Sequence, residues 1–143
     1  MAVATPYIAR MPSLLIGTAP GTELVCHARK VSLVPTTNTT DVETFCNPGG
    51  TAPGTDTWVC EFDALQSYGD TGSPGLWDTL RPLANTAVTF TLKPADGTVS
   101  ATNPSATFTA WVPSIPFIDA EIGGNTVLTV TCPLVGAPVF ATT

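Results

Sequence analysis

The chain has 143 residues, of which 25 are threonine, 43% are hydrophobic and only 11% are charged, and its formal net charge is −6 at pH 7. This length fits one domain that can hold a core without a metal ion or a disulfide. The five basic residues form no stripe, which argues against a conventional DNA- or RNA-binding surface. So low a charge indicates that other subunits cover much of the surface in the working state.

Residues 1–21 are predicted to form an N-terminal arm, followed by a single β domain over residues 22–143. Three prolines exclude a helix from the arm, and residues 13–16 are expected as a short edge strand. The arm lacks the charged segment and the long apolar run of an export signal or a membrane span. We therefore expect a protein that is made and assembled in a cytoplasm and has no membrane partner.

The next segment, residues 22–34, is predicted to be a long strand with a bend. Its apolar residues share one parity up to Ala28 and the other from Val31, which predicts a bulge or a bend at Arg29 and Lys30. The lone histidine, His27, is interpreted as a surface residue and not as a catalyst. Residues 35–54 are rich in Thr, Asn, Gly and Pro, and are expected to be an interfacial loop with a short strand at 42–45.

Residues 55–65 alternate apolar and polar side chains and are predicted to be a strand. Glu61 and Asp63 share the polar face, a pattern that is compatible with a metal site or an acid–base pair. No histidine or third carboxylate accompanies them in the sequence, so a solvated or lumen-facing side is favoured.

Residues 73–81 are the only predicted helix, with Ser73 as the N-cap and Pro74 at the first helical position. Its apolar stripe is expected to lie on a sheet. The stripe consists of Leu76, Trp77, Leu80 and Leu83.

The clearest strand pair covers residues 87–93 and 105–112, joined by a connection rich in turn residues. Alternation gives each strand a core face, expected to lie under the helix, and a threonine face. The core residues are Val88, Phe90, Leu92, Ala106, Phe108, Ala110 and Val112. The threonine face consists of Thr89, Thr91, Thr107 and Thr109, together with Lys93 and Trp111. A last strand is predicted at 125–132, and residues 133–140 can continue along a sheet edge.

No sequence pattern points to an enzyme or to a cofactor. The chain has no phosphate-binding glycine loop, nucleophile elbow or H-E-x-x-H motif. The four cysteines contain no C-x-x-C pair, which makes a zinc site improbable. Cys26, Cys60 and Cys132 are interpreted as small core residues, while one or two disulfides stay open if the protein is exported.

Several short motifs follow one another along the chain, at residues 21–24, 31–35, 41–46, 58–65, 75–78, 88–90, 102–104, 123–124 and 133–138. Their order resembles that of major tail proteins (tail tube proteins) of long-tailed bacteriophages infecting actinobacteria. Cys132 departs from the family pattern, in which a tryptophan is expected before Pro133.

The resemblance implies a β-sandwich or barrel-like tail tube fold with one short flanking α-helix, long loops and an N-terminal arm. It implies hexameric rings that stack into a hollow tube in the virion tail, through which viral DNA passes without specific binding. The implied partners are other copies of this chain, the tape measure protein, the tail terminator and distal tail proteins.

Within that architecture the resemblance gives roles to the surfaces of the chain. Glu61 and Asp63 become candidate lumen-facing acidic residues. Thr89, Thr91, Thr107 and Thr109 become a candidate inter-subunit wall. Loops 35–54 and 68–74 are expected to make contacts between rings.

Two alternatives share the strand content and the threonine content. One is a capsid-decorating protein or an immunoglobulin-like adhesion module of a virion. An adhesion module that binds sugars would expose aromatic rings, for which Trp111 and Tyr68 are the candidates, although core or interface packing is favoured for both. The other alternative is a small hydrolase that uses His27 or the Glu61/Asp63 pair.

Overall fold

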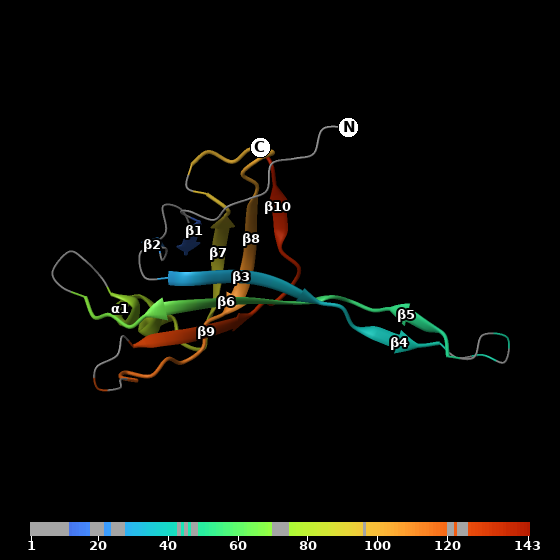
Figure 1. Ribbon diagram of the computed structural model, residues 1–143, viewed down its shortest axis with the longest axis horizontal. Helices are drawn as coiled ribbons and strands as arrows, with labels where there is room; N and C mark the ends of the chain where they lie inside the picture. The colour runs from blue at the N-terminus through green and yellow to red at the C-terminus, as the bar shows by residue number, and fades with distance from the viewer. Residues whose placement is uncertain are drawn as a thin grey trace.

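The structure, a computed structural model, shows a mainly β protein built from two packed sheets and a projecting two-stranded ribbon (Figure 1). It describes residues 12–17, 22–23, 28–42, 44, 46, 49–69, 75–95, 97–119, 122 and 126–143. The described strands form open sheets and do not close a barrel. In the described part of the chain, helix is confined to α1 (Leu76–Leu80) and the 3-10 turn η1 (Arg81–Leu83).

The larger sheet, sheet A, has the strand order β10-β8-β7-β1-β2. Its strands are β1 (Ser13–Ile16), β2 (Thr22–Glu23), β7 (Ala87–Lys93), β8 (Ser105–Trp111) and β10 (Val139–Ala141). Sheet B has the order β3-β6-β9, with β3 (Ala28–Thr36), β6 (Thr57–Leu65) and β9 (Val127–Pro133). The strands of sheet B run across those of sheet A in Figure 1, as in orthogonally packed sandwiches.

The core lies between the two sheets, where every second residue of the central strands points inward. Phe90 of β7 and Phe108 of β8 are register partners, and their rings stack with centroids 5.5 Å apart. Phe62 of β6 and Val130 of β9 face them from sheet B and are about 1% exposed. Burying a side chain of this size contributes about 1.5–3 kcal/mol, so these alternating residues hold the sandwich together.

The β7–β8 pair confirms the strand pair predicted from the alternation of residues 87–93 and 105–112. Asn103 organises the connection between the two strands. Its side-chain amide accepts from the Ala95 N–H and donates to the carbonyls of Ala95 and Thr98. One polar side chain therefore closes a loop that has no regular strand pairing of its own.

The parity switch at the start of β3 is confirmed as a β-bulge. Ala28 pairs with Ala64 and Lys30 with Asp63, so Arg29 is the extra residue. The strand expected at residues 13–16 is present as β1, but it pairs with both β2 and β7 and is not at an edge. Leu14 is fully buried there, which places this part of the expected N-terminal arm in the core. Residues 1–11, Cys26 and His27 lie outside the described residues.

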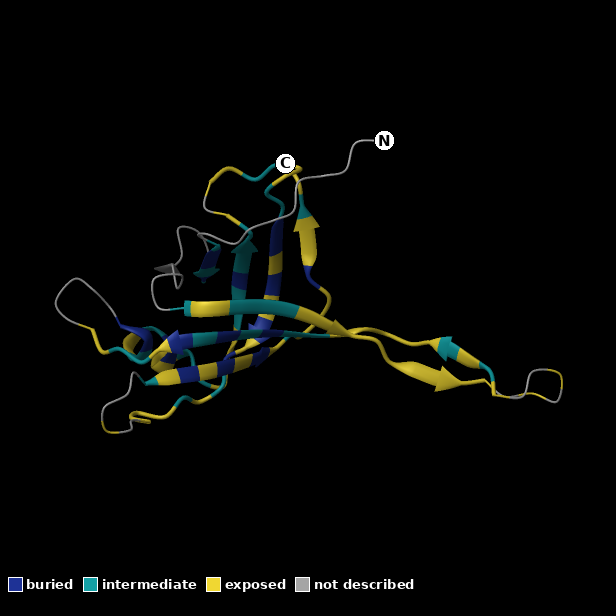
Figure 2. Ribbon diagram, viewed as in Figure 1, coloured by how far each residue is buried: buried dark blue, intermediate teal, exposed yellow. Residues whose placement is uncertain are grey.

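The loop predicted for residues 35–54 contains a β-ribbon, formed by β4 (Thr39–Asp41) and β5 (Thr51–Pro53). The short strand expected at 42–45 would begin directly after β4. Two of its residues, Glu43 and Phe45, lie outside the described residues. We call residues 37–56 the ribbon. It continues the β3–β6 pair away from the body, and none of its described side chains is buried (Figure 2).

Helix α1 is shorter than predicted, and its N-cap is Gly75 where Ser73 was expected. Ser73 and Pro74 lie outside the described residues. A Cβ at Gly75 would meet the backbone of Ser67, Tyr68 and Gly69 at 2.6–2.7 Å, so only glycine fits this close approach. Leu76 and Leu80 are fully buried, as the predicted stripe requires. Trp77 is different, because it is only half-buried and contacts Phe117.

Candidate functional site

The four candidate wall threonines lie together on the outer face of sheet A. Thr89 pairs with Thr109 and Thr91 with Thr107, so they form two directly opposed cross-strand pairs. The Val112 N–H donates to the Thr86 carbonyl, so residues 86 and 112 form a hydrogen-bonded pair. Hydrogen-bonded and non-hydrogen-bonded pairs alternate along the strands, so both threonine pairs are non-hydrogen-bonded, the type in which opposed side chains lie closer together. Trp111, 48% exposed, continues this face along β8, and Lys93 continues it along β7.

The two candidate acidic residues lie on the outer face of sheet B, on its central strand β6. Thr129 donates a hydrogen bond to a carboxylate oxygen of Asp63 at 2.7 Å. Thr131 donates to Glu61 at 3.2 Å. Lys30, the register partner of Asp63, belongs to the same face. The sequence predicted the orientation of the two carboxylates, but their threonine partners come from β9, more than 60 residues away.

These carboxylates are not arranged as a ligand set. Within the described ranges, no three His, Cys, Asp or Glu side chains lie close enough together to share a metal ion. In the same ranges, no helix has the length and apolar character needed to cross a bilayer.

The outer edge of β9 is open among the described residues. Hydrogen bonds from the Leu134 N–H to the Trp58 carbonyl and from the Gln66 N–H to the Thr126 carbonyl fix the alternation along β9. Thr129 and Thr131 therefore direct their backbone groups away from β6. The backbone nitrogen of Pro133 also points away from β6. Because proline has no N–H, the pairing with β6 loses no hydrogen bond, but the open edge lacks one donor at this position.

The outer edge of β3 is also open among the described residues and also contains a proline. The alternation of the central strand β6 leaves the backbone groups of Val31 and Leu33 pointing outward, where no described strand pairs with them. Pro35 shares their parity and interrupts this edge near the base of the ribbon. Each edge of sheet B thus offers a short stretch of unpaired donors and acceptors that ends at a proline.

An aromatic cluster, formed by Tyr68, Trp77 and Phe117, lies at the end of sheet B opposite the ribbon. Phe117 contacts Trp77 with centroids 5.2 Å apart and Tyr68 at 5.4 Å. Phe117 is 62% exposed and Tyr68 is 50% exposed. The Arg81 guanidinium lies 5.7 Å from the centre of the Trp77 ring and adds a positive charge to the cluster.

The side chain of Gln66 holds the segment that carries Phe117 through the kind of hydrogen bonds that a neighbouring strand would make. The Gln66 amide donates to the Phe117 carbonyl at 2.7 Å, and its oxygen accepts from the Asp119 N–H at 3.1 Å. The Tyr68 hydroxyl also donates to the Phe117 carbonyl. The exposed rings are therefore presented on a fixed backbone. The sequence did not predict this cluster, because its members come from three separate segments.

The comparisons with known proteins give no assignment. No protein-family model matches the chain, and a search of curated proteins finds no similar sequence. The conclusions about function therefore depend on the surfaces described above and on the resemblance in motif order.

Proposed function

We propose that this chain is a structural virion protein, a tail tube subunit that assembles into stacked rings, hexameric in the family that its motif order resembles, around a conduit for phage DNA. The observation that carries the proposal is the ribbon, a projecting pair of strands with no buried side chain in its described part. A long extension that contributes nothing to its own core is expected where it binds another subunit.

Open strand edges add to this argument. Sheet B has two open edges in the described part of the chain, and a ring of subunits would pair such edges with one another. The threonine pairs of sheet A offer a second polar surface for contacts between subunits. Contacts between subunits would cover each of these surfaces, which agrees with the low fraction of charged residues in the chain.

The acidic face of sheet B supports a conduit. Glu61 and Asp63 are held by threonine hydroxyls on an outward face, and six copies of a chain of charge −6 carry about −36 per ring. A wall of this sign repels the phosphates of DNA and lets the polymer slide. We therefore assign these two residues to the lumen and expect no specific contact with bases.

Negative-stain electron microscopy of the concentrated protein tests the proposal. We expect rings or hollow tubes of uniform diameter, whose number increases with protein concentration. A protein that stays monomeric at high concentration contradicts the proposal. Binding to isolated capsids without self-stacking would instead identify a capsid-decorating protein.

A further inference from the structure

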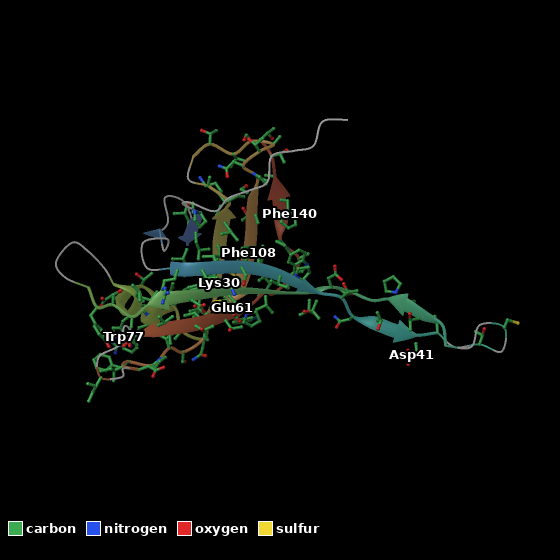
Figure 3. All side chains as sticks on the ribbon, viewed as in Figure 1. Lys30, Asp41, Glu61, Trp77, Phe108 and Phe140 are labelled. Carbon is green, nitrogen blue, oxygen red and sulfur yellow. The ribbon has the colours of Figure 1, made fainter. Side chains whose placement is uncertain are left out.

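Two cysteines lie opposite one another in the core, on neighbouring strands of sheet B. Cys60 of β6 and Cys132 of β9 are register partners, so their side chains point to the same face of the sheet, toward sheet A. Both are fully buried and both are free thiols. Glu61, labelled in Figure 3, is the next residue of β6 and points to the outer face instead. The inward face of sheet B therefore holds two thiols side by side.

The backbone spacing at this pair fits a disulfide. The Leu134 N–H donates to the Trp58 carbonyl, and such pairs recur at every second residue, so Cys60 and Cys132 form a hydrogen-bonded pair. The Cα atoms of such a pair are about 5.5 Å apart, within the range of about 4.4–6.8 Å that disulfides span. The Cβ atoms of register partners are about 4.5–5.5 Å apart, whereas a disulfide needs about 3.5–4.5 Å. Closing the bond therefore draws the strands slightly together, which makes it easier to reduce than an unstrained disulfide.

Burial protects the two thiols while the sheet is closed. It raises the pKa of both to about 12, and the thiolate is the form that reacts with oxidants. Strand β9 is the outer strand of sheet B, and no described strand covers its free edge. Local opening of β9 from β6 exposes Cys132 to solvent and lowers its pKa toward the ordinary value of 9.0. We therefore expect the pair to react through opening of this edge strand.

The geometry points to Cys60 and Cys132 as an oxidative modification site, a thiol pair that hydrogen peroxide converts into a reversible disulfide between β6 and β9. The Cys132 sulfur takes one oxygen from the peroxide, whose O–O bond breaks, and a sulfenic acid and one water are formed. The Cys60 sulfur then displaces this oxygen as a second water, and the S–S bond forms. The two sulfurs lose two electrons in total, and the peroxide gains them.

The bond joins the open edge strand of sheet B to the central strand. Reducing surroundings keep the pair as thiols, and oxidising surroundings close a covalent loop over residues 60–132. A loop of this length restricts the unfolded chain strongly, so the disulfide stabilises the folded state. The site does not depend on the proposed tube function, because it operates within one copy of the chain.

Peptide mapping of the full-length protein tests the site. The folded protein is treated with hydrogen peroxide, its remaining thiols are alkylated, and cleavage before each aspartate places the four cysteines on four separate peptides. In the band that runs as a monomer on a non-reducing gel, we expect residues 56–62 to be linked to residues 119–143, and dithiothreitol to separate them. Circular dichroism checks that the protein stays folded. A folded protein in which these two peptides stay unlinked, although the exposed Cys46 is oxidised, overturns the proposal.

Thermal unfolding measures the effect of the bond on stability. The midpoint of the oxidised parent should lie at least about 5 °C above that of the reduced parent. Cys46→Ser, which removes an exposed thiol, is the matched control and should keep this difference. Cys60→Ala should abolish it, and comparing oxidised with reduced samples of the same variant cancels any loss of core packing. A difference in Cys60→Ala equal to that of the parent would assign the effect to another cysteine and overturn the proposal.

Discussion

Cys60 and Cys132 are register partners on β6 and β9, and both are free thiols in the core. Burial raises the pKa of each from 9.0 to about 12, and for Cys60 the neighbouring Cys132 adds to the effect. Both side chains therefore remain neutral and act as small apolar residues. Cys46, on the ribbon, is exposed and free, so thiol reagents should modify it first among the three described cysteines.

The raised pKa values predict a loss of stability at high pH. The folded state keeps the two thiol protons to a higher pH than the unfolded state does, so their contribution is complete below about pH 9. It decreases by up to about 1.4 kcal/mol per pH unit for each thiol between pH 9 and 12. Urea unfolding of the parent and of Cys60→Ala/Cys132→Ala measures this, and a parent slope equal to that of the variant would contradict it.

Single residues show clearly what a sequence can predict here. The bulge at Arg29 was predictable because a change of parity is local information, and the outward orientation of Glu61 and Asp63 was predictable for the same reason. Their bonds to Thr131 and Thr129 were not, because the register between β6 and β9 is set by packing between distant segments. The aromatic cluster was missed for that same reason.

At the scale of elements, the central strands of the core were predicted and the ribbon was not. The single strand predicted over residues 22–34 was wrong, because β2 belongs to sheet A and β3 to sheet B. β7 and β8 each bury one face, so their sequences alternate between apolar and polar residues. β4 and β5 bury neither face, and a run of Thr, Asp, Ala and Pro has no alternation to detect. Backbone pairing between β4 and β5, and not a hydrophobic face, makes these residues strands.

The base of the ribbon depends on one glycine, which gives a prediction for this element. A Cβ at Gly54 would lie 2.9 Å from the Asn38 carbonyl oxygen, which accepts the Gly54 N–H. Gly54→Ala should therefore weaken the ribbon locally by about 1–2 kcal/mol and change global unfolding by less than about 0.5 kcal/mol. Hydrogen exchange resolved by peptide measures both values.

Gly136→Ala is the control for this change, since a Cβ there meets no atom within 4 Å. Equal exchange in the ribbon of both variants would show that the approach of Gly54 to Asn38 does not hold the two strands together.

For the whole molecule, the body and the ribbon should be separable. Replacing residues 37–56 by Asn-Gly connects the register partners Thr36 and Thr57 through a two-residue turn. Because no buried side chain is removed from the described part of the ribbon, the thermal midpoint should change by only a few degrees. Electron microscopy should show no long tubes. Tubes of parental length would show that the ribbon is dispensable for assembly.

The prolines on the edges of sheet B oppose aggregation of the free chain. Amyloid-like growth needs an uninterrupted row of backbone donors, so that identical strands can add without limit. Pro35 and Pro133 interrupt the two open edges at positions that cost the native sheet no hydrogen bond. Under the proposed tube function, a subunit made in many copies would thus keep its edges available for a short, specific partner while resisting conversion into fibrils.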